Sequence, residues 1–154
     1  MISLYLTNLL AMRTNRSKCP LVNILDILGD KWSLIIIRDL FLGKKTFTEF
    51  MSSSEKFASN ILSNRLEFLI HHGLIKAIKL PHDKKTKLYY LTDKGVDLYP
   101  ILYEMMNWSK RNLDKEFGPL GIKFFKESKR VSSKTFIKRT QSKYTEIRNE
   151  FLDV

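Results

Sequence analysis

Four small, uncharged polar residues lie close together in the chain, at Ser59, Asn60, Ser63 and Asn64. Their spacing places them on one side of a helix, over its first two turns. An asparagine amide can make a bidentate pair with an adenine edge, and a serine hydroxyl can donate to or accept from several bases. The same face is also typical of a helix side that is only solvated, so the neighbouring sequence must decide between the two interpretations.

A lysine-rich hairpin follows this helix directly in the sequence. Glycine ends the predicted helix, and two short strands separated by a turn come next. Lysines around such a turn suit contacts with phosphates or with the minor groove, which position a protein on DNA but specify little of its sequence. Their alternative role is that of a solvated loop. The predicted bounds are Ser59–His72 for the helix, Leu74–Leu80 and Lys87–Leu91 for the strands and Pro81–Thr86 for the turn, and the lysines are Lys84, Lys85 and Lys87.

Two further basic residues are candidates for phosphate contacts. Lys31 begins a predicted helix, beside the positively polarised end where an anion can bind. Arg65 lies on the flank of helix Ser59–His72, near its apolar stripe, so it can bind a phosphate or pair with an acidic residue inside the fold. Arg38 lies in an apolar helix, and we expect it to make an internal ion pair.

The composition favours a polyanionic partner. The 154 residues include 27 Lys and Arg against 16 Asp and Glu, for a formal net charge of +11. Nucleic acid is the first candidate and an anionic membrane surface the second, although codon usage in an AT-rich genome also enriches lysine. The sequence contains no glycine-rich phosphate loop, no nucleophile–base pattern and no recognised metal-ligand spacing, so we predict no enzyme, no cofactor and no metal site.

The ends of the chain differ from its centre. Residues 1–12 are apolar but too short to span a bilayer, and they lack the features of a signal peptide, so we expect a cytoplasmic protein, associated with the nucleoid, that does not enter the membrane. We expect residues 1–18 to form a helical arm that contacts a second subunit. Residues 118–154 carry nine basic and four acidic residues, and a last amphipathic helix from Ser133 is expected to lie on the dimer.

The elements around the motif can be placed from caps and periodicity. Pro20 and Gly29 mark the start and stop of one helix, and Asp30 can cap the next, a nearly all-apolar and therefore central helix from Lys31 to Leu42. Thr46 and Glu49 have capping-box spacing for a short helix. The fold class is therefore mainly α with a small β-hairpin, with a DNA-binding unit over residues 19–92.

A long helix is predicted from Asp93 to Glu116, capped by Thr92 and kinked at Pro100. Its apolar stripe is too broad for one small domain to cover, so we assign residues 93–117 to dimerisation. The residues expected in the subunit interface are Leu98, Ile101, Leu102, Met105, Met106 and Trp108.

This order of helices and hairpin is that of a winged helix-turn-helix, and the sequence resembles the HxlR-type transcriptional regulators of bacteria and archaea. The resemblance extends from Cys19 to Trp108 and rests on the segments CPLVNILDILGDKWSLIIIRDL, FTEF, ILSNRLEFLIHHGLI, YYLTDKG and LYPILYEMMNW. It implies a homodimeric, double-stranded DNA-binding regulator in which helix Ser59–His72 reads the bases. The lysine-rich turn departs from the proline-rich turn that many members carry.

Cys19 is a candidate sensor of oxidants or electrophiles. It precedes Pro20 at a helix N-terminus, next to Lys18, and both features favour the reactive thiolate. Several regulators that resemble this chain use a cysteine here for sensing, so the resemblance implies a small-molecule or electrophile effector. Because the chain has one cysteine, an intrachain disulfide is excluded, and a disulfide could form only between subunits or with a small thiol. The alternative is a structural cysteine.

The predicted function is therefore a sequence-specific, homodimeric DNA-binding transcriptional regulator that responds to thiol chemistry at Cys19. Two alternatives remain at this stage. One is an architectural protein that binds DNA without sequence preference, and the other is a winged helix that binds an acidic protein partner. The target genes and the direction of regulation cannot be deduced from the sequence.

Overall fold

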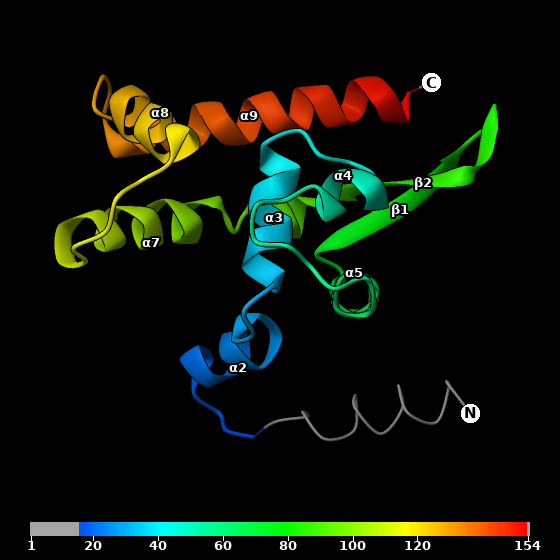
Figure 1. The fold of residues 1–154 in the computed structure, drawn as a ribbon, viewed down its shortest axis with the longest axis horizontal. Coiled ribbons are helices and arrows are strands. Elements are labelled where there is room, and N and C mark those ends of the chain that lie inside the picture. The colour runs from blue at the N-terminus through cyan, green and yellow to red at the C-terminus, as the bar shows by residue number, and fades with distance from the viewer. Residues whose placement is uncertain (1–15, 154) are drawn as a thin grey trace.

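The computed structural model describes residues 16–153, so most of the expected arm at residues 1–18 lies outside the described part of the chain (Figure 1). The chain forms helices and one antiparallel hairpin, which projects from one side of the molecule (Figure 1), and this combination is the one expected from the sequence. The elements are α2 (Pro20–Leu28), α3 (Ser33–Phe41), α4 (Phe47–Met51), α5 (Ser59–His71), β1 (Ile75–Leu80), β2 (Asp83–Leu91), α6 (Asp93–Val96), α7 (Tyr99–Asn112), α8 (Pro119–Ser128) and α9 (Ser133–Leu152).

Helix α3 is the centre of the core, as its apolar sequence predicts. Ile36 and Ile37 are fully buried, and Leu40 is nearly so. The other elements lie around this helix in Figure 1, with the hairpin and α5 on one side and α7 on the other. A fully buried side chain of this size contributes about 1.5–3 kcal/mol to stability, so α3 provides a firm base for the elements packed on it.

Two predicted helix caps are confirmed. The Thr46 hydroxyl accepts a hydrogen bond from the Glu49 backbone N–H, and the Glu49 carboxylate accepts one from the Thr46 N–H, at 3.2 and 2.9 Å. The Thr92 hydroxyl accepts from the Gly95 N–H at the start of α6. These bonds satisfy backbone donors that a helix start leaves unpaired.

The hairpin is longer than predicted. Strand β2 begins at Asp83, four residues before the expected start at Lys87, and only residues 81–82 separate the strands. Pairing is irregular near the tip, where Lys79 faces Lys87 but Leu80 faces Asp83. The Asp83 carboxylate accepts hydrogen bonds from the N–H groups of Lys85 and Thr86, which satisfies backbone groups at this irregularity.

Two glycines are required where the hairpin joins the helices. Gly73 ends α5 with a φ of 71°, a conformation that costs other residues energy. Gly95 lies against the start of the hairpin, and a Cβ there would come within 2.2 Å of the Leu74 carbonyl oxygen. The close packing of α6 on this strand therefore depends on the absence of a side chain.

The predicted helix from Asp93 to Glu116 is two helices. A turn at residues 97–98 interrupts the α-helix between Val96 and Tyr99, so α6 and α7 are separate elements. Pro100 lies in the first turn of α7, where its missing N–H would have no helical partner in any case. The kink expected at Pro100 is therefore a helix start, and α7 ends at Asn112 rather than Glu116.

Helix α9 packs on its own subunit rather than on a partner as we expected. It lies above the hairpin and α3 in Figure 1. The Tyr144 hydroxyl accepts a hydrogen bond from the Leu91 N–H at 2.8 Å, and Arg148 donates to the Leu91 carbonyl at 3.0 Å and pairs with Asp93 at 2.8 Å. We call the part of the chain from Gly118 onward the C-terminal extension. Through Tyr144 and Arg148 it holds the end of β2 in place, a contact that we call the clamp.

These elements form a winged helix-turn-helix, with α5 as the second helix of the turn motif and the hairpin as the wing. The predicted fold class is confirmed, and the described C-terminal extension supplies two extra helices, α8 and α9. Among residues 16–153, no helix combines the length and apolar character needed to cross a bilayer.

We predict that Arg148→Leu lowers the free energy of unfolding by about 1–3 kcal/mol, because it leaves the Leu91 carbonyl without a buried donor. Urea denaturation followed by circular dichroism measures this change. Arg130→Leu, at an exposed arginine of the same extension, is the control and should have little effect. Equal losses for both variants would show that the clamp does not stabilise the fold.

Candidate nucleic-acid interface

The polar face of α5 is exposed because its opposite side is buried. Leu62 and Leu69 are fully buried, and Leu66 is 2% exposed. The spacing of these leucines directs the other side of the helix to solvent. The exposed face includes all four residues predicted to contact bases, which are Ser59, Asn60, Ser63 and Asn64.

The two asparagines differ in their surroundings. The side-chain oxygen Oδ1 of Asn64 accepts a hydrogen bond from the Arg65 guanidinium at 2.8 Å, which orients the Asn64 side-chain amide. The Asn60 side chain makes no hydrogen bond within the described residues, so its donors and acceptor are free for a ligand. Asn60 is therefore the stronger candidate for a bidentate contact with a base.

The sequence allowed two roles for Arg65, a phosphate contact or an internal ion pair, and the structure shows the internal ion pair. Its side chain is 10% exposed and lies 3.6 Å from the Asp30 carboxylate, with the guanidinium 4.5 Å from the centre of the Phe68 ring. We therefore withdraw the phosphate role that we expected for Arg65. The arginine links α5 to the chain before α3 and helps to fix the rotation of α5 about its axis.

The start of α3 is already occupied by a carboxylate. Asp30 accepts hydrogen bonds from the backbone N–H groups of Trp32 and Ser33, at 2.9 and 3.0 Å. Burial alone would raise the pKa of the Asp30 carboxyl, but these bonds, the Ser33 hydroxyl and the nearby Arg65 outweigh it and hold the pKa below its usual value. Lys31 is exposed, but the helix end that we expected to bind a phosphate beside it is filled.

A buried carboxylate connects α3 to the turn before α5. Asp39 is fully buried and accepts hydrogen bonds from Arg38, Lys44 and Ser53. Such a charge is tolerated inside a protein only when it is paired and hydrogen-bonded. The role of Asp39 could not be predicted from the sequence, because a single acidic residue in an apolar helix gives no indication of its partners.

Arg38 extends this network to Glu55, which confirms the internal pair expected for Arg38. The guanidinium donates to both carboxylate oxygens of Glu55, at 2.7 and 3.0 Å. This bond holds the pKa of Glu55 at about 2, below its usual 4.5, so the pair stays charged at neutral pH. The turn between α4 and α5 is thereby attached to α3.

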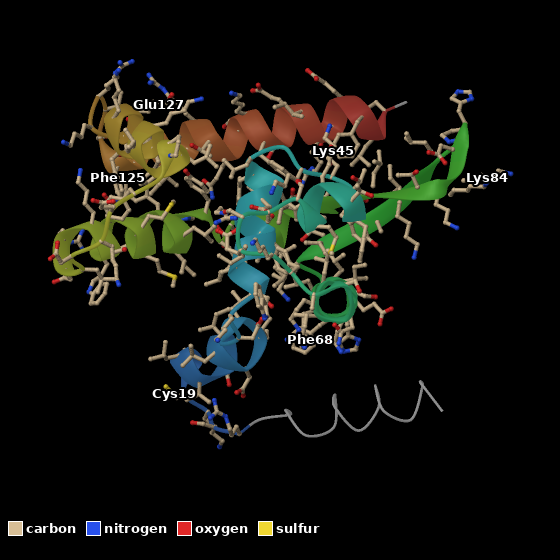
Figure 2. The ribbon with its side chains drawn as sticks, in the orientation of Figure 1. Cys19, Lys45, Phe68, Lys84, Phe125 and Glu127 are labelled. Carbon is tan, nitrogen blue, oxygen red and sulfur yellow. The ribbon has the colours of Figure 1, made fainter. Side chains whose placement is uncertain are left out.

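The wing presents its lysines to solvent. Lys84, Lys85 and Lys87 are all exposed, and Lys84 lies at the outer end of the hairpin, away from the helices (Figure 2). We call the hairpin β1–β2 with these lysines the cationic wing. It is a neighbour of the polar face of α5, since β1 packs against α5.

Lys79 also belongs to the cationic wing, although sequence analysis did not identify it. It faces Lys87 across the hairpin, on the side of the strands that carries the Ala77–Tyr89 pair. Two lysines that face each other in this way repel, and a bound phosphate would relieve that repulsion. The alternation of Ile75, Ala77 and Lys79 along the strand was a signal for this placement.

Cys19 is exposed at the start of α2, at a distance from the wing in Figure 2. Its backbone N–H donates to the Ser17 hydroxyl at 3.1 Å. Pro20 occupies the first turn of the helix, as predicted. Among residues 16–153, no cluster of three His, Cys, Asp or Glu residues could hold a metal ion.

The expected subunit interface divides into buried and exposed residues. Leu98 and Leu102 are 7% and 6% exposed and pack in the core of their own subunit, so we remove them from the interface. Met106 is partly buried against the same core. Ile101, Met105 and Trp108 are the accessible residues of the expected set, and their spacing places them on one face of α7.

Helix α2 carries a second exposed apolar pair that we did not assign to the interface. Leu21 and Leu25 are separated by one helical turn and are 63% and 48% exposed. Their spacing places both on the same side of the helix, where they form an apolar stripe. Periodicity identified the stripe but could not show whether the same subunit covers it.

Comparison with known proteins gives a consistent match to the central part of the chain. The model of the HxlR-like helix-turn-helix family matches residues 27–117. YvaP of Bacillus subtilis, named as an HTH-type transcriptional regulator, is 34% identical over 92 residues, which make up 60% of this chain and 85% of YvaP.

Two solved structures resemble the same region. The crystal structure of PA1607 has 36% sequence identity and a TM-score of 0.61, and the match covers 67% of this chain and 73% of PA1607. The redox regulator HypR in its oxidised form has 32% identity and a TM-score of 0.56, and the match covers 63% of this chain and all of the HypR chain. The family match ends at residue 117, before α8 and α9 begin.

Proposed function

The chain belongs to the HxlR-like helix-turn-helix family of transcriptional regulators, and we propose that it is a homodimer that binds specific sequences of double-stranded DNA. In this proposal α5 enters the major groove, and the wing contacts the phosphates beside it. The observation that carries the proposal is the exposed Ser and Asn face of α5 on a rigidly held helix next to a cationic hairpin.

The different roles proposed for α5 and the wing follow from their side chains. The N-terminal residues of a reading helix are those that reach base edges, and Ser59, Asn60, Ser63 and Asn64 occupy that end of α5. Lysine is a cation without a fixed hydrogen-bonding fork, so Lys79, Lys84, Lys85 and Lys87 suit phosphates rather than particular bases.

A dimer would place two reading helices in successive major grooves, about one helical turn apart. The accessible apolar residues of α7 and α2 are the surface that we propose for the subunit contact. Large apolar side chains at about half exposure on two helices are unfavourable in water, and a second copy of the chain would cover them.

We predict that Asn60→Ala relaxes sequence preference whereas Lys84→Ala weakens binding to all duplexes about equally. The asparagine substitution should remove roughly 1–3 kcal/mol of discrimination at one base pair in each half-site. The lysine substitution should reduce the slope of log affinity against log salt by about one per subunit. Selection of duplexes from a random pool, followed by fluorescence anisotropy across salt concentrations, measures both effects.

Lys126→Ala is the control for this experiment, because Lys126 is exposed on α8, away from the wing. If no sequence is enriched by the wild-type protein although binding depends on salt, the chain is an architectural DNA binder. If no duplex binds at low salt, the winged helix serves another partner. Either result would contradict the proposed function.

We predict that the double substitution Met105→Glu and Trp108→Glu dissociates the dimer, because it buries carboxylates in an apolar contact. Sedimentation velocity at micromolar concentration should show a dimer for the wild type and a monomer for the variant. Leu120→Glu, at another exposed apolar residue on α8, is the matched control and should remain dimeric. A wild-type monomer would rule out the dimer.

We also propose that Cys19 responds to oxidants or electrophiles. Its support is the exposed thiol on α2, beside the proposed subunit surface at Leu21 and Leu25, together with the likeness to a redox regulator. An adduct on this thiol would place a bulky group next to that surface and change how the two subunits meet.

We therefore expect alkylation by N-ethylmaleimide to weaken duplex binding by the wild-type protein. Fluorescence anisotropy with a selected duplex measures the change, and mass spectrometry verifies a single adduct. Cys19→Ser treated in the same way is the control and should bind unchanged. Identical affinity of the alkylated and untreated wild-type protein would show that Cys19 has no sensing role.

A further inference from the structure

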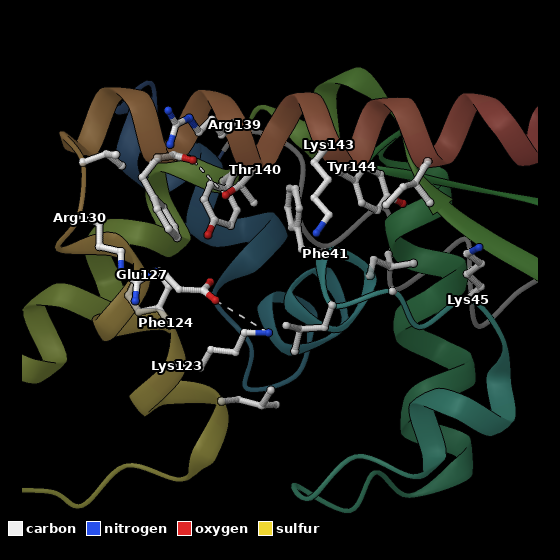
Figure 3. A pocket seen from close by; sticks show the side chains of 18 of the residues that line it. Phe41, Lys45, Lys123, Phe124, Glu127, Arg130, Arg139, Thr140, Lys143 and Tyr144 are labelled. Carbon is white, nitrogen blue, oxygen red and sulfur yellow. Dashed lines mark hydrogen bonds and ion pairs between the residues drawn. The ribbon is translucent and has the colours of Figure 1, made fainter.

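A hollow of about 520 Å³ lies between the C-terminal extension and the end of α3 (Figure 3). Its volume is in the range of small-molecule sites. Its lining comes from α3 and the segment after it, from the start of α7, and from α8 and α9. The extension therefore forms much of the wall, and the part of the chain matched by the family model forms the rest.

Aromatic side chains form much of the wall of the hollow, and they pack against one another. Phe41 lies 4.8 Å from Tyr99 and 5.2 Å from Tyr144, measured between ring centres. Phe124 and Phe136 meet edge to face, with their ring centres 5.7 Å apart. Such contacts keep the rings from collapsing into the hollow, so a flat apolar body could enter it without rearranging the fold.

Cations surround this apolar wall. The lining includes Lys45, Lys123, Arg130, Arg139 and Lys143, against Glu127 as its one acidic residue. Lys123 lies 4.0 Å from Glu127, and Lys45 lies over the Phe151 ring. Arg130, Arg139 and Lys143 have no acidic partner in residues 16–153, and Figure 3 shows the Lys143 amine directed into the hollow.

We propose that this hollow binds an amphipathic organic anion, an aromatic carboxylate, with the ring against the phenylalanines and the carboxylate at Lys143. Unpaired cations beside a partly enclosed apolar wall repel one another, and an anion there would reduce that repulsion. A neutral aromatic compound would gain only the apolar contacts, and an aromatic amine would meet like charge. The chemistry of the wall and rim thus selects for both an apolar body and a negative group.

The same residues connect the hollow to the wing. Tyr144 lines the hollow, and its hydroxyl accepts the hydrogen bond from the Leu91 N–H at the base of β2. Arg148, one turn further along α9, holds the Leu91 carbonyl. A ligand that shifts α9 therefore changes how the wing is held. This regulatory consequence rests on the proposed function, whereas binding of the anion does not.

Isothermal titration calorimetry of the full chain, without DNA, tests the binding site. We expect 2-naphthoate to bind with saturation at one site per chain, and 2-naphthalenemethanol, which has the same rings but no charge, to bind more weakly. Absence of saturable binding of 2-naphthoate at millimolar concentration would overturn the proposal. Equal affinity for the two compounds would overturn the role of the cations.

Two variants locate the site on the molecule. Lys143→Gln should weaken 2-naphthoate binding by roughly fivefold, as expected for loss of one partly exposed ion pair. Lys134→Gln, on the same helix but outside the lining of the hollow, should bind as the wild type does. Leu120→Glu should also weaken binding, because Leu120 lines the opening and is 63% exposed. If all three variants bind 2-naphthoate with the affinity of the wild-type protein, the ligand binds elsewhere on the molecule.

Duplex binding measured on the same samples separates the two proposals. If 2-naphthoate binds and no duplex is selected, the hollow is a ligand site and the proposed DNA-binding function fails. If a duplex is selected and 2-naphthoate does not bind, the function stands and this inference fails. If both bind, 2-naphthoate should change duplex affinity, and the duplex should change 2-naphthoate affinity by the same factor; independent binding would overturn the link through Tyr144.

Discussion

The burial of one side of α5 is the constraint on which the rest of this structure depends. Leu62, Leu66 and Leu69 pack into the core around α3, and this packing fixes the rotation of α5 about its axis. Arg65 adds a directional contact, because its pair with Asp30 holds α5 against the chain before α3. A helix held in this way can present small polar side chains outward without their contributing to the fold. The leucines maintain the packing, so substitutions of those polar side chains should leave the shape of the fold unchanged.

The C-terminal extension applies a second constraint, to the wing. A two-stranded hairpin is weakly stable by itself, and here α9 holds its base through Tyr144 and Arg148. Of these two residues, Tyr144 also lines the hollow between α8, α9 and α3. Helix α9 therefore braces the wing and also forms part of the wall of the hollow, which is why we propose that a ligand in the hollow would affect the wing. The thiol on α2 lies in a different part of the molecule, near the exposed apolar residues of α2.

Sequence periodicity predicted the type and order of the elements well, because caps and stop signals are local. Thr46 with Glu49, Thr92 and Gly73 each mark a boundary through bonds or angles within a few residues. What the sequence could not show was which surface covers each apolar stripe. Leu98 and Leu102 had the same pattern as Ile101 and Met105, yet the first two are covered by their own subunit. Arg65 and Asp30 pair across a long stretch of chain, and no local pattern records such a contact. The sequence also did not show that β2 begins at Asp83 and not at Lys87, since the irregular pairing at the tip of the wing depends on hydrogen bonds to the Asp83 side chain.

The most direct test of the central claim is to locate α5 on DNA. The chain has a single cysteine, so Cys19→Ser combined with Glu67→Cys gives one attachment site for an iron–EDTA group on the exposed face of α5, beyond the residues proposed to contact bases. On a duplex selected by the unmodified protein, we predict two clusters of strand cleavage about one helical turn apart. A group attached through Lys126→Cys on α8 in the same Cys19→Ser background should not produce these clusters. Uniform cleavage, or the same pattern from both positions, would contradict the assignment of α5 as the reading helix.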